Sequence, residues 1–354
     1  YGTNEVVGSD GSMVSSPPVI RGNSLYTIVN GPSWTEAEAN AVNLGGHLIT
    51  IEAEVEHDFI YDTYSHMLGE LEEEGEDSLH IGLTRKADFT FENQAGYFDG
   101  WISGSTSEWR PEYWGIGGTG GDSGSEGEYT GLILRPADVG PWIGVWNDYP
   151  NLHDRQSKGI AEIPFIRRGD SAYVIVEGPT WEEAEANANA LGGHLVTIND
   201  AEENEWIASE FSKEKHYYDG DSSNPSDTHF WLGGTDSAIE DSWKWASGQE
   251  WTFDGFDRDH PVMTLPNDGG DHLVGIFNVT SNTALGGGVI HGDGPGTFYW
   301  DDYEIPNHIS FKGIAEISLA SNNTPAGTLT LSGDFKVGQT INIDASSISD
   351  ADNF

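Results

Sequence analysis

The chain has 354 residues and contains no cysteine. This absence excludes a disulfide framework, a thiolate zinc site and a cysteine nucleophile. It does not indicate the redox compartment in which the protein folds. The fold must therefore be held by packing, hydrogen bonds, ion pairs or bound ions.

Lysine and arginine are scarce, because 15 basic residues stand against 59 acidic ones, for a net charge of −44. Such a surface repels polyanions and has few cations to displace counterions, so we expect no nucleic-acid partner. The same repulsion disfavours anionic membrane surfaces. No apolar run approaches the roughly 18 residues of a membrane span, and the N-terminal residues do not resemble a signal peptide. We expect no membrane insertion in this segment and a chain that begins and ends within a longer protein.

Aromatic residues are abundant, with 13 Trp, 13 Tyr and 14 Phe. Disordered chains rarely contain so many rings, so the low hydrophobic content of 36% does not indicate disorder. The composition predicts a folded protein whose acidic groups are partly balanced by bound cations and partly solvated. At roughly 100–200 residues per domain, the length favours two or three domains.

One long segment of the sequence occurs twice. GPSWTEAEANAVNLGGHLITI at 31–51 recurs as GPTWEEAEANANALGGHLVTI at 178–198, which is 147 residues later. Shorter matches follow in the same order and end with KGIAEI at 158–163 and 312–317. A repeat of this length is a domain rather than a solenoid unit.

The repeat determines the expected domain boundaries. The stretch 164–170 between the copies is too short for a flexible tether, so we expect the copies to pack against each other. After residue 319 the sequence takes on the alternating pattern of an all-β module. The predicted domains are 21–164 and 167–319, preceded by a tail or the end of another module at 1–20 and followed by a linker and the truncated start of an Ig- or cadherin-like repeat at 320–354.

Each copy is predicted to begin with a strand and a helix. The motifs SWTE at 33–36 and TWEE at 180–183 both fit a capping box at a helix start. A Gly-Gly pair provides the helix stop in each copy. A second helix is predicted from apolar residues at helical spacing, namely Val55, Phe59 and Ile60 or Trp206, Ile207 and Phe211.

Several spaced motifs together resemble one known family. They are the helix that ends in Gly-Gly-His-Leu, WLGG at 231–234, WKWASG at 243–248, PNDGGD at 266–271 and WND at 146–148. In this combination the chain resembles a tandem pair of cysteine-free bacterial C-type lectin-like domains, as found in large calcium-dependent surface adhesins. The resemblance implies an α+β fold, in which two helices flank two small antiparallel sheets in each domain and a long loop region holds ligands.

The resemblance also implies calcium sites in the long loop regions. Calcium takes about six to eight hard oxygen ligands, which Asp, Glu and Asn supply. Two positions depart from the family pattern, because Leu265 replaces a ligand and Arg110 cannot bind a cation. For the Asn and Asp residues the alternative is turn formation. The candidate calcium ligands are Glu112, Glu128, Asn147 and Asp148 in the first copy and Asn267, Asp268, Asp271, Asp301 and Asp302 in the second.

A sugar is the ligand that the resemblance implies, because vicinal hydroxyls can complete a calcium shell. The candidate sugar contacts are Asn267, Asp271 and Asp301, together with the loop rings Trp109, Trp114, Trp142, Phe298 and Tyr299. For these rings the alternative is partial burial against the domain body. We expect five other tryptophans in the core and two histidines in structural roles, which are Trp34, Trp181, Trp231, Trp245, Trp251, His47 and His194.

The leading functional hypothesis is a calcium-dependent carbohydrate-binding segment of a large extracellular bacterial adhesin, at the cell surface or secreted. Its partner would be a cell-surface glycan or polysaccharide, and tandem domains would add avidity. The alternative is a protein-binding or structural C-type lectin-like pair without direct sugar contact, in which calcium only stabilises loops. An enzyme is disfavoured, because the catalytic members of the superfold that we compare depend on cysteine. Where the family usually has a disulfide cysteine, this chain has Ala161 and Ala315.

Overall fold

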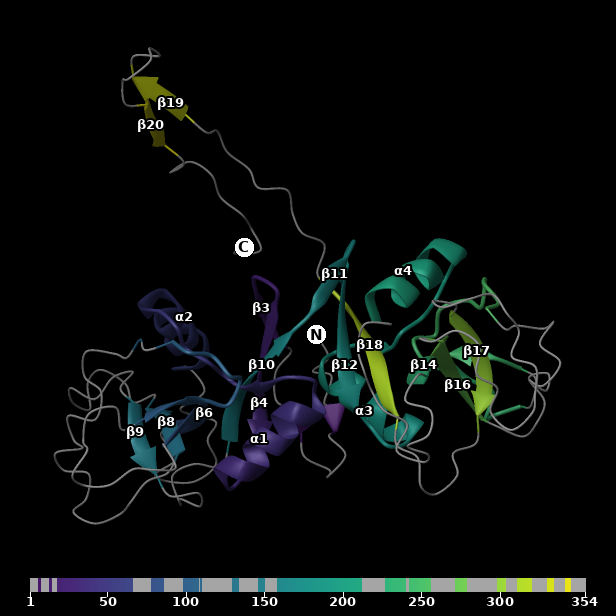
Figure 1. Ribbon diagram of the computed structural model, residues 1–354, viewed down its shortest axis with the longest axis horizontal. Coiled ribbons are helices and arrows are strands. Elements are labelled where there is room, and N and C mark those ends of the chain that lie inside the picture. The colour runs from purple at the N-terminus through teal and green to yellow at the C-terminus, as the bar shows by residue number, and fades with distance from the viewer. Residues whose placement is uncertain are drawn as a thin grey trace.

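The computed structural model describes the greater part of both repeat copies and four short strands outside them (Figure 1). The described residues are 6–7, 13–14, 18–65, 78–85, 98–107, 109, 129–133, 146–149, 158–211, 227–239, 242–255, 271–278, 298–303, 311–319, 330–333 and 341–344. Within these ranges the fold is mixed, with four helices and two large sheets. None of these four helices has the length and hydropathy needed to cross a bilayer.

The first sheet and its helices, which we call the first unit, occupy residues 18–164. Its elements are β3 (Val19–Arg21), β4 (Ser24–Asn30), α1 (Trp34–Asn43), β5 (His47–Leu48), α2 (Glu54–Tyr64), β6 (Ser78–Arg85), β7 (Phe98–Trp101), β8 (Tyr129–Ile133), β9 (Trp146–Tyr149) and β10 (Lys158–Pro164).

The second unit occupies residues 166–319 and repeats these elements in the same order. They are β11 (Ile166–Arg168), β12 (Ser171–Glu177), α3 (Trp181–Ala190), β13 (His194–Leu195), α4 (Ala201–Phe211), β14 (Asp227–Thr235), β15 (Lys244–Trp245), β16 (His272–Asn278), β17 (Phe298–Tyr303) and β18 (Lys312–Ser318). Outside the two units lie β1 (Val6–Val7), β2 (Met13–Val14), β19 (Thr330–Gly333) and β20 (Ile341–Asp344).

Both large sheets have eight strands in the same order. The order is β3-β4-β10-β6-β8-β9 in the first unit and β11-β12-β18-β14-β16-β17 in the second. This differs from the expected pairs of small antiparallel sheets. A short parallel contact, Gly159 with His80 or Gly313 with Trp231, joins the antiparallel parts into one mixed sheet.

The last strand of each unit lies inside its sheet, although it comes last in the sequence. β10 pairs along its whole length with β4, and β18 pairs in the same way with β12. Each unit is therefore closed by hydrogen bonds between its first long strand and its last strand. At the C-terminal end, β19 and β20 form an antiparallel pair, in agreement with the strand pattern in the sequence.

The helix starts follow the predicted capping chemistry with one difference. At α3 the capping box is complete, since Thr180 and Glu183 each accept a bond from the other's backbone amide. At α1 the Ser33 side chain accepts from the Glu36 backbone amide, as in a capping box. The difference is that the Glu36 carboxylate accepts from the Ser33 hydroxyl, at 2.6 Å, rather than from the Ser33 backbone amide. The stops are as predicted, because Gly45 and Gly192 have φ of +89° and +80°.

The buried faces of the second helices also follow the sequence, except at Val55. This side chain is 67% exposed, so its predicted place in the apolar stripe is wrong. It lies in the first turn of α2, whereas Ile60 and Tyr64 further along are buried. In α4, Ile207 and Phe211 are buried as predicted.

The buried apolar side chains form three clusters. One includes α2 and surrounds Trp146, and its counterpart in the second unit surrounds Trp300. The third cluster includes α1 and α3 and continues from one unit into the other. The prediction that the copies pack against each other is therefore confirmed. Four of the five tryptophans predicted to be core residues are buried, and Trp251 is half-buried.

The cap of α3 is testable by substitution. Thr180→Ala should lower the free energy of unfolding by about 1 kcal/mol, because the Glu183 amide loses its acceptor. The measurement is chemical denaturation followed by tryptophan fluorescence. Thr180→Ser keeps the acceptor and is the control, so equal losses in both variants would show that the cap is not the source of the effect.

Candidate functional site

In each unit one pair of predicted ligands falls on the terminal strand of the sheet, β9 or β17. In the second unit Asp301 pairs with Val274 and Asp302 with Leu273, across β16 and β17. In the first unit Asn147 pairs with Gly131 and Asp148 with Thr130, across β8 and β9. β9 and β17 are the terminal strands of their sheets. The two candidate sites thus take equivalent places in the two units.

Asp271 directly precedes β16, and its position is fixed by backbone contacts. Its carbonyl oxygen accepts from the Thr235 hydroxyl at 2.7 Å and from the Asp236 amide at 3.3 Å. The Asp271 residue itself is exposed. The contact therefore joins the end of β14 to the start of β16. Asp271 lies three residues before Val274, the strand partner of Asp301.

Asp236 is a residue that the sequence analysis missed. It is an acidic residue with only 2% of its surface exposed, and it lies against Asp271. A signal was present in the sequence, because an Asp follows immediately after the strand Trp-Leu-Gly-Gly-Thr. Asp236 therefore helps to fix the position of Asp271 at the start of β16.

The other predicted ligands lie outside the described residues or have no described side chain. Asn267, Asp268, Glu112, Glu128, Trp114 and Trp142 belong to the first group, and Asn147, Asp148, Asp301, Asp302 and Tyr299 belong to the second. Among the side chains that are described, no three of His, Asp or Glu gather as a metal site. The residue types at the edge, all carboxylates and amides, fit a hard cation.

Two of the predicted loop rings are described, and both pack onto the body of their unit. Trp109 is half-buried and meets Trp146 edge to face, with ring centroids 5.6 Å apart. Phe298 is half-buried, and its ring lies so close to Gly275 that a Cβ at that glycine would lie 2.5 Å from the nearest ring atom. The alternative of partial burial is therefore the one observed for these two rings.

The start of β16 is also tied to helix α3. The His272 ring stacks on Trp181 with centroids 4.6 Å apart, and its Nε2 lies 3.0 Å from the Glu182 carboxylate. In the first unit Tyr129 stacks on Trp34 at the same centroid distance. The strand that precedes each candidate edge is thus anchored to the first helix of its unit.

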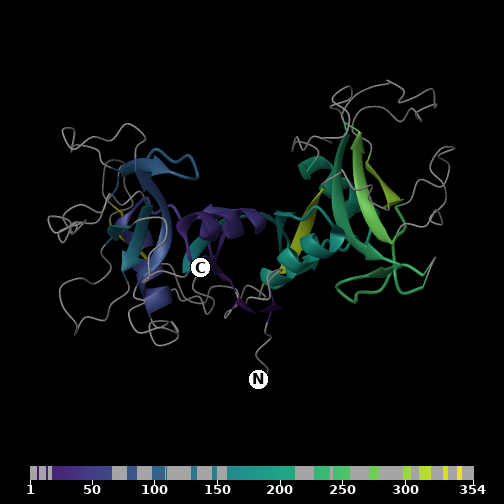
Figure 2. The same ribbon diagram turned by 90° about the horizontal axis from the view of Figure 1, so that it is seen from below.

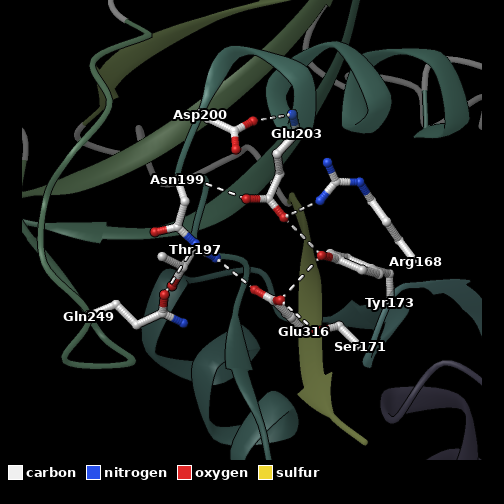
Figure 3. A network of polar contacts seen from close by, with 9 residues as sticks. All are labelled: Arg168, Ser171, Tyr173, Thr197, Asn199, Asp200, Glu203, Gln249 and Glu316. Carbon is white, nitrogen blue, oxygen red and sulfur yellow. Dashed lines mark hydrogen bonds and ion pairs between the residues drawn. The ribbon is translucent and has the colours of Figure 1, made fainter.

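A second polar centre, which we call the carboxylate hub, lies in the interior of each unit. In the second unit it consists of Arg168, Tyr173, Glu203 and Glu316 (Figure 3). The Tyr173 hydroxyl lies 2.9 Å from Glu203 and 3.2 Å from Glu316, and Arg168 binds Glu203 at 3.1 Å. These residues come from β11, β12, α4 and β18, so the hub ties the unit's first and last strands to its second helix.

Further bonds around the hub satisfy the remaining carboxylate oxygens. The Ser171 hydroxyl donates to Glu316 at 2.8 Å, and the Thr197 amide donates to its other oxygen at 3.4 Å. The Asn199 amide donates to Glu203 at 2.9 Å, and the Asp200 side chain caps α4 by accepting from the Glu203 amide (Figure 3). Both Glu203 and Glu316 therefore have hydrogen-bond partners within the unit and serve to hold its elements together.

The electrostatics of the hub follow from burial. Burial raises the pKa of the Glu316 carboxyl group, and the nearby Glu203 acts in the same direction, while bonds from Ser171, Thr197 and Tyr173 oppose the shift. Burial and the two carboxylates also raise the pKa of the Tyr173 hydroxyl, so this group stays protonated and donates. Arg168 supplies the positive charge that makes two adjacent acids tolerable.

The same hub is present in the first unit, formed by Arg21, Tyr26, Glu56 and Glu162. Burial likewise raises the pKa of Glu162. Beside it lies a polar hollow of about 340 Å³, lined by Glu52, Glu56, Glu162 and several hydroxyl groups. Each of these three acids has a partner, since Ser105 donates to Glu52, Arg21 to Glu56 and Ser24 to Glu162.

The two repeat histidines have structural roles, as predicted. Nδ1 of His47 lies 2.6 Å from Glu38, and Nδ1 of His194 lies 2.6 Å from Glu185. The second oxygen of each glutamate accepts from the backbone amide of Leu48 or Leu195. Each pair therefore fixes the strand that follows the helix stop.

A family model matches part of the second unit. The family model described as Lectin C-type domain matches residues 177–267, which run from the end of β12 through α3, α4, β14 and β15. A C-type lectin domain is therefore present in the chain.

The chain is also similar to individual proteins. It is 32% identical over 72 residues to a perlucin-like protein of Mytilus galloprovincialis, and this match covers 20% of the chain and 40% of that relative. Among solved structures it is similar to human lithostathine, with 19% identity and a TM-score of 0.30 over 44% of this chain and 96% of the other. The carbohydrate-recognition domain of the mouse scavenger receptor C-type lectin gives 20% identity and a TM-score of 0.30 over 44% and 95%.

The hub is testable through its hydroxyl group. Tyr173→Phe should lower the free energy of unfolding by about 1–3 kcal/mol, because the two buried carboxylates lose the single hydroxyl donor that they share, while the ring contacts remain. Denaturation at neutral pH measures the change. Tyr64→Phe is the matched control, because the Tyr64 hydroxyl is buried and has no hydrogen-bond partner among the described residues. Equal effects in both variants would remove the special role of the hub.

The pair of His194 and Glu185 predicts a pH dependence. The hydrogen bond to Glu185 raises the pKa of His194 above its usual 6.5. Its stabilisation should be fully present below the unfolded-state pKa and disappear as the pH rises through the folded-state pKa. His194→Gln should therefore lose more stability, relative to the native chain, at about pH 5.5 than at about pH 8.5. A loss that is independent of pH would contradict this assignment.

Proposed function

We propose that the chain is a carbohydrate-binding segment in which two C-type lectin-like domains follow one another, at 21–164 and 167–319, and that calcium at the outer strand edges binds the sugar. The observation that supports this most directly is the shared register of the candidate ligands. Asn147-Asp148 on β9 and Asp301-Asp302 on β17 occupy equivalent positions, each pair following a buried tryptophan.

The chemistry of these residues suits calcium and a sugar together. Carboxylate and amide oxygens provide hard ligands, and a flexible shell of about six to eight oxygens leaves places for two hydroxyls. The candidate contributors are Asp271, Asp301 and Asp302 in the second unit and Asn147 and Asp148 in the first. A bound cation also relieves the repulsion within a chain of net charge −44.

The rival function is a protein-binding or structural pair in which calcium only stabilises loops. Two observations favour it. Leu265 and Arg110 stand where the resemblance calls for ligands. The hubs also connect the first and last strands of both units through hydrogen bonds and ion pairs between side chains. In both readings the chain is a binding or structural module rather than an enzyme.

The proposed setting is extracellular, at the surface of a bacterial cell or in secreted form, within a large adhesin. The acid excess supports this, because calcium that neutralises such a chain is available outside the cell. The strand pair β19–β20 fits a following all-β repeat in 320–354. The proposed partner is a cell-surface glycan or polysaccharide.

The test is a glycan array with the chain in calcium and again in chelator. Glycan binding should be lost in chelator, and Asp302→Ala should weaken it at least about tenfold, or about 1.4 kcal/mol. Glu202→Ala, which removes an exposed acid on α4, is the charge-matched control and should bind as the native chain does. Binding that persists in chelator would refute the calcium-mediated contact, and silence on all glycans would favour the rival.

A further inference from the structure

The two units are joined without a flexible linker. β10 ends at Pro164, β11 begins at Ile166, and only Phe165 lies between them. Phe165 is itself buried in the cluster that continues through both units, and its amide donates to the Asn23 carbonyl at 2.9 Å. The connection is thus part of the core, which leaves little freedom for one unit to turn against the other.

The contact between the units depends on a glycine. The turn after α1 meets β12 so closely that a Cβ at Gly45 would overlap the Ile175 carbonyl oxygen and lie 2.8 Å from Cγ1 of Val174. A Cβ at the equivalent Gly192, after α3, would meet no described atom within 4 Å. The contact is therefore head to tail rather than two-fold symmetric, since only one of the two equivalent turns is covered.

The contact is also local. Beside it lies a hollow of about 450 Å³ lined by both units, including Val42 and His47 from the first and Ile175 and Lys312 from the second. Residues from β1 and β2 contact α3 and β4, one in each unit, and so add a second connection across the pair.

This docking directs the two candidate edges away from each other. In Figure 1, β8 and β9 lie at one end of the molecule, β16 and β17 lie at the other, and α1, β4 and β12 lie between them. Figure 2 shows the same separation after a quarter turn. A single short ligand cannot reach both edges, whereas two separate glycan chains can.

We infer that the pair is a rigid, outward-facing bridge that links two glycan chains, with Gly45 as the residue that permits the docking. This inference rests on the proposed function for the identity of the ligand, but the rigid docking itself does not. The two parts can therefore be tested separately.

Docking can be measured as a distance, because the chain has no cysteine of its own. Asp58→Cys and Glu205→Cys, at exposed and equivalent positions of α2 and α4, would accept spin labels. Electron–electron double resonance should give a single narrow distance distribution in the otherwise native chain. Gly45→Asn should broaden or shift it, and Gly192→Asn should not. Asn is tolerated at positive φ, so both variants retain the helix stop.

A broad distribution in the native chain, or the same response from both Asn variants, would overturn the rigid docking. Neither result depends on glycan, so this failure is distinct from silence on the array. Circular dichroism of each variant identifies loss of folding, and a variant that fails it is replaced by Gly45→Ala and Gly192→Ala.

Bridging is measured with beads coated with the glycan that the array identifies. The native chain should crosslink the beads, whereas Asp148→Ala and Asp302→Ala should each bind beads without crosslinking them, because one edge remains. Crosslinking by both variants, or complete loss of binding in either one, would overturn the two-ended bridge.

Discussion

In each unit, a glutamate on the last strand binds a tyrosine on the first long strand, and the arrangement of the whole unit depends on this contact. Glu316 and Tyr173 are 143 residues apart in sequence and face each other across β18 and β12. Ala315, next to Glu316, stands where the resembling family has a cysteine. Because there is no disulfide here, side-chain contacts such as the hub join the first long strand to the last strand. Within the hub, Arg168 and Glu203 also hold the second helix in place. In the first unit, the same contact is formed by residues of the same types.

This closure explains how two folded units are built from so acidic a chain. Two adjacent buried carboxylates are costly unless donors and a positive charge surround them, and one arginine is committed to each pair. Arg21 and Arg168 are two of only 15 basic residues in the chain. The remaining acids have few cationic side chains to pair with. The excess of negative charge is therefore a property of the whole composition rather than of any one site.

Short sequence motifs predicted much of the fold, whereas contacts between residues far apart in the sequence could not be predicted from it. The repeat, the caps at Ser33 and Thr180 and the stops at Gly45 and Gly192 are short motifs whose chemistry is complete within a few residues. The hub joins residues from four elements, so no sequence window contains it. Val55 had the right spacing but lies in the first turn of its helix, on the exposed side. Of the candidate site, the register of Asp301 and Asp302 follows from the structure, whereas the upstream ligands rest on the resemblance.

The position of the hubs has a mechanical consequence for a chain held at both ends. Tension from the first unit passes through Phe165 into the three-residue strand β11 and then reaches Ser171, whose strand partner is Ser318, close to where the chain leaves the unit. Force applied there separates β12 from β18 one pair at a time, starting from this end. The third pair is Tyr173 with Glu316. The hub therefore lies close to the end at which the two strands begin to separate, so its hydrogen bonds must break early when the chain is pulled.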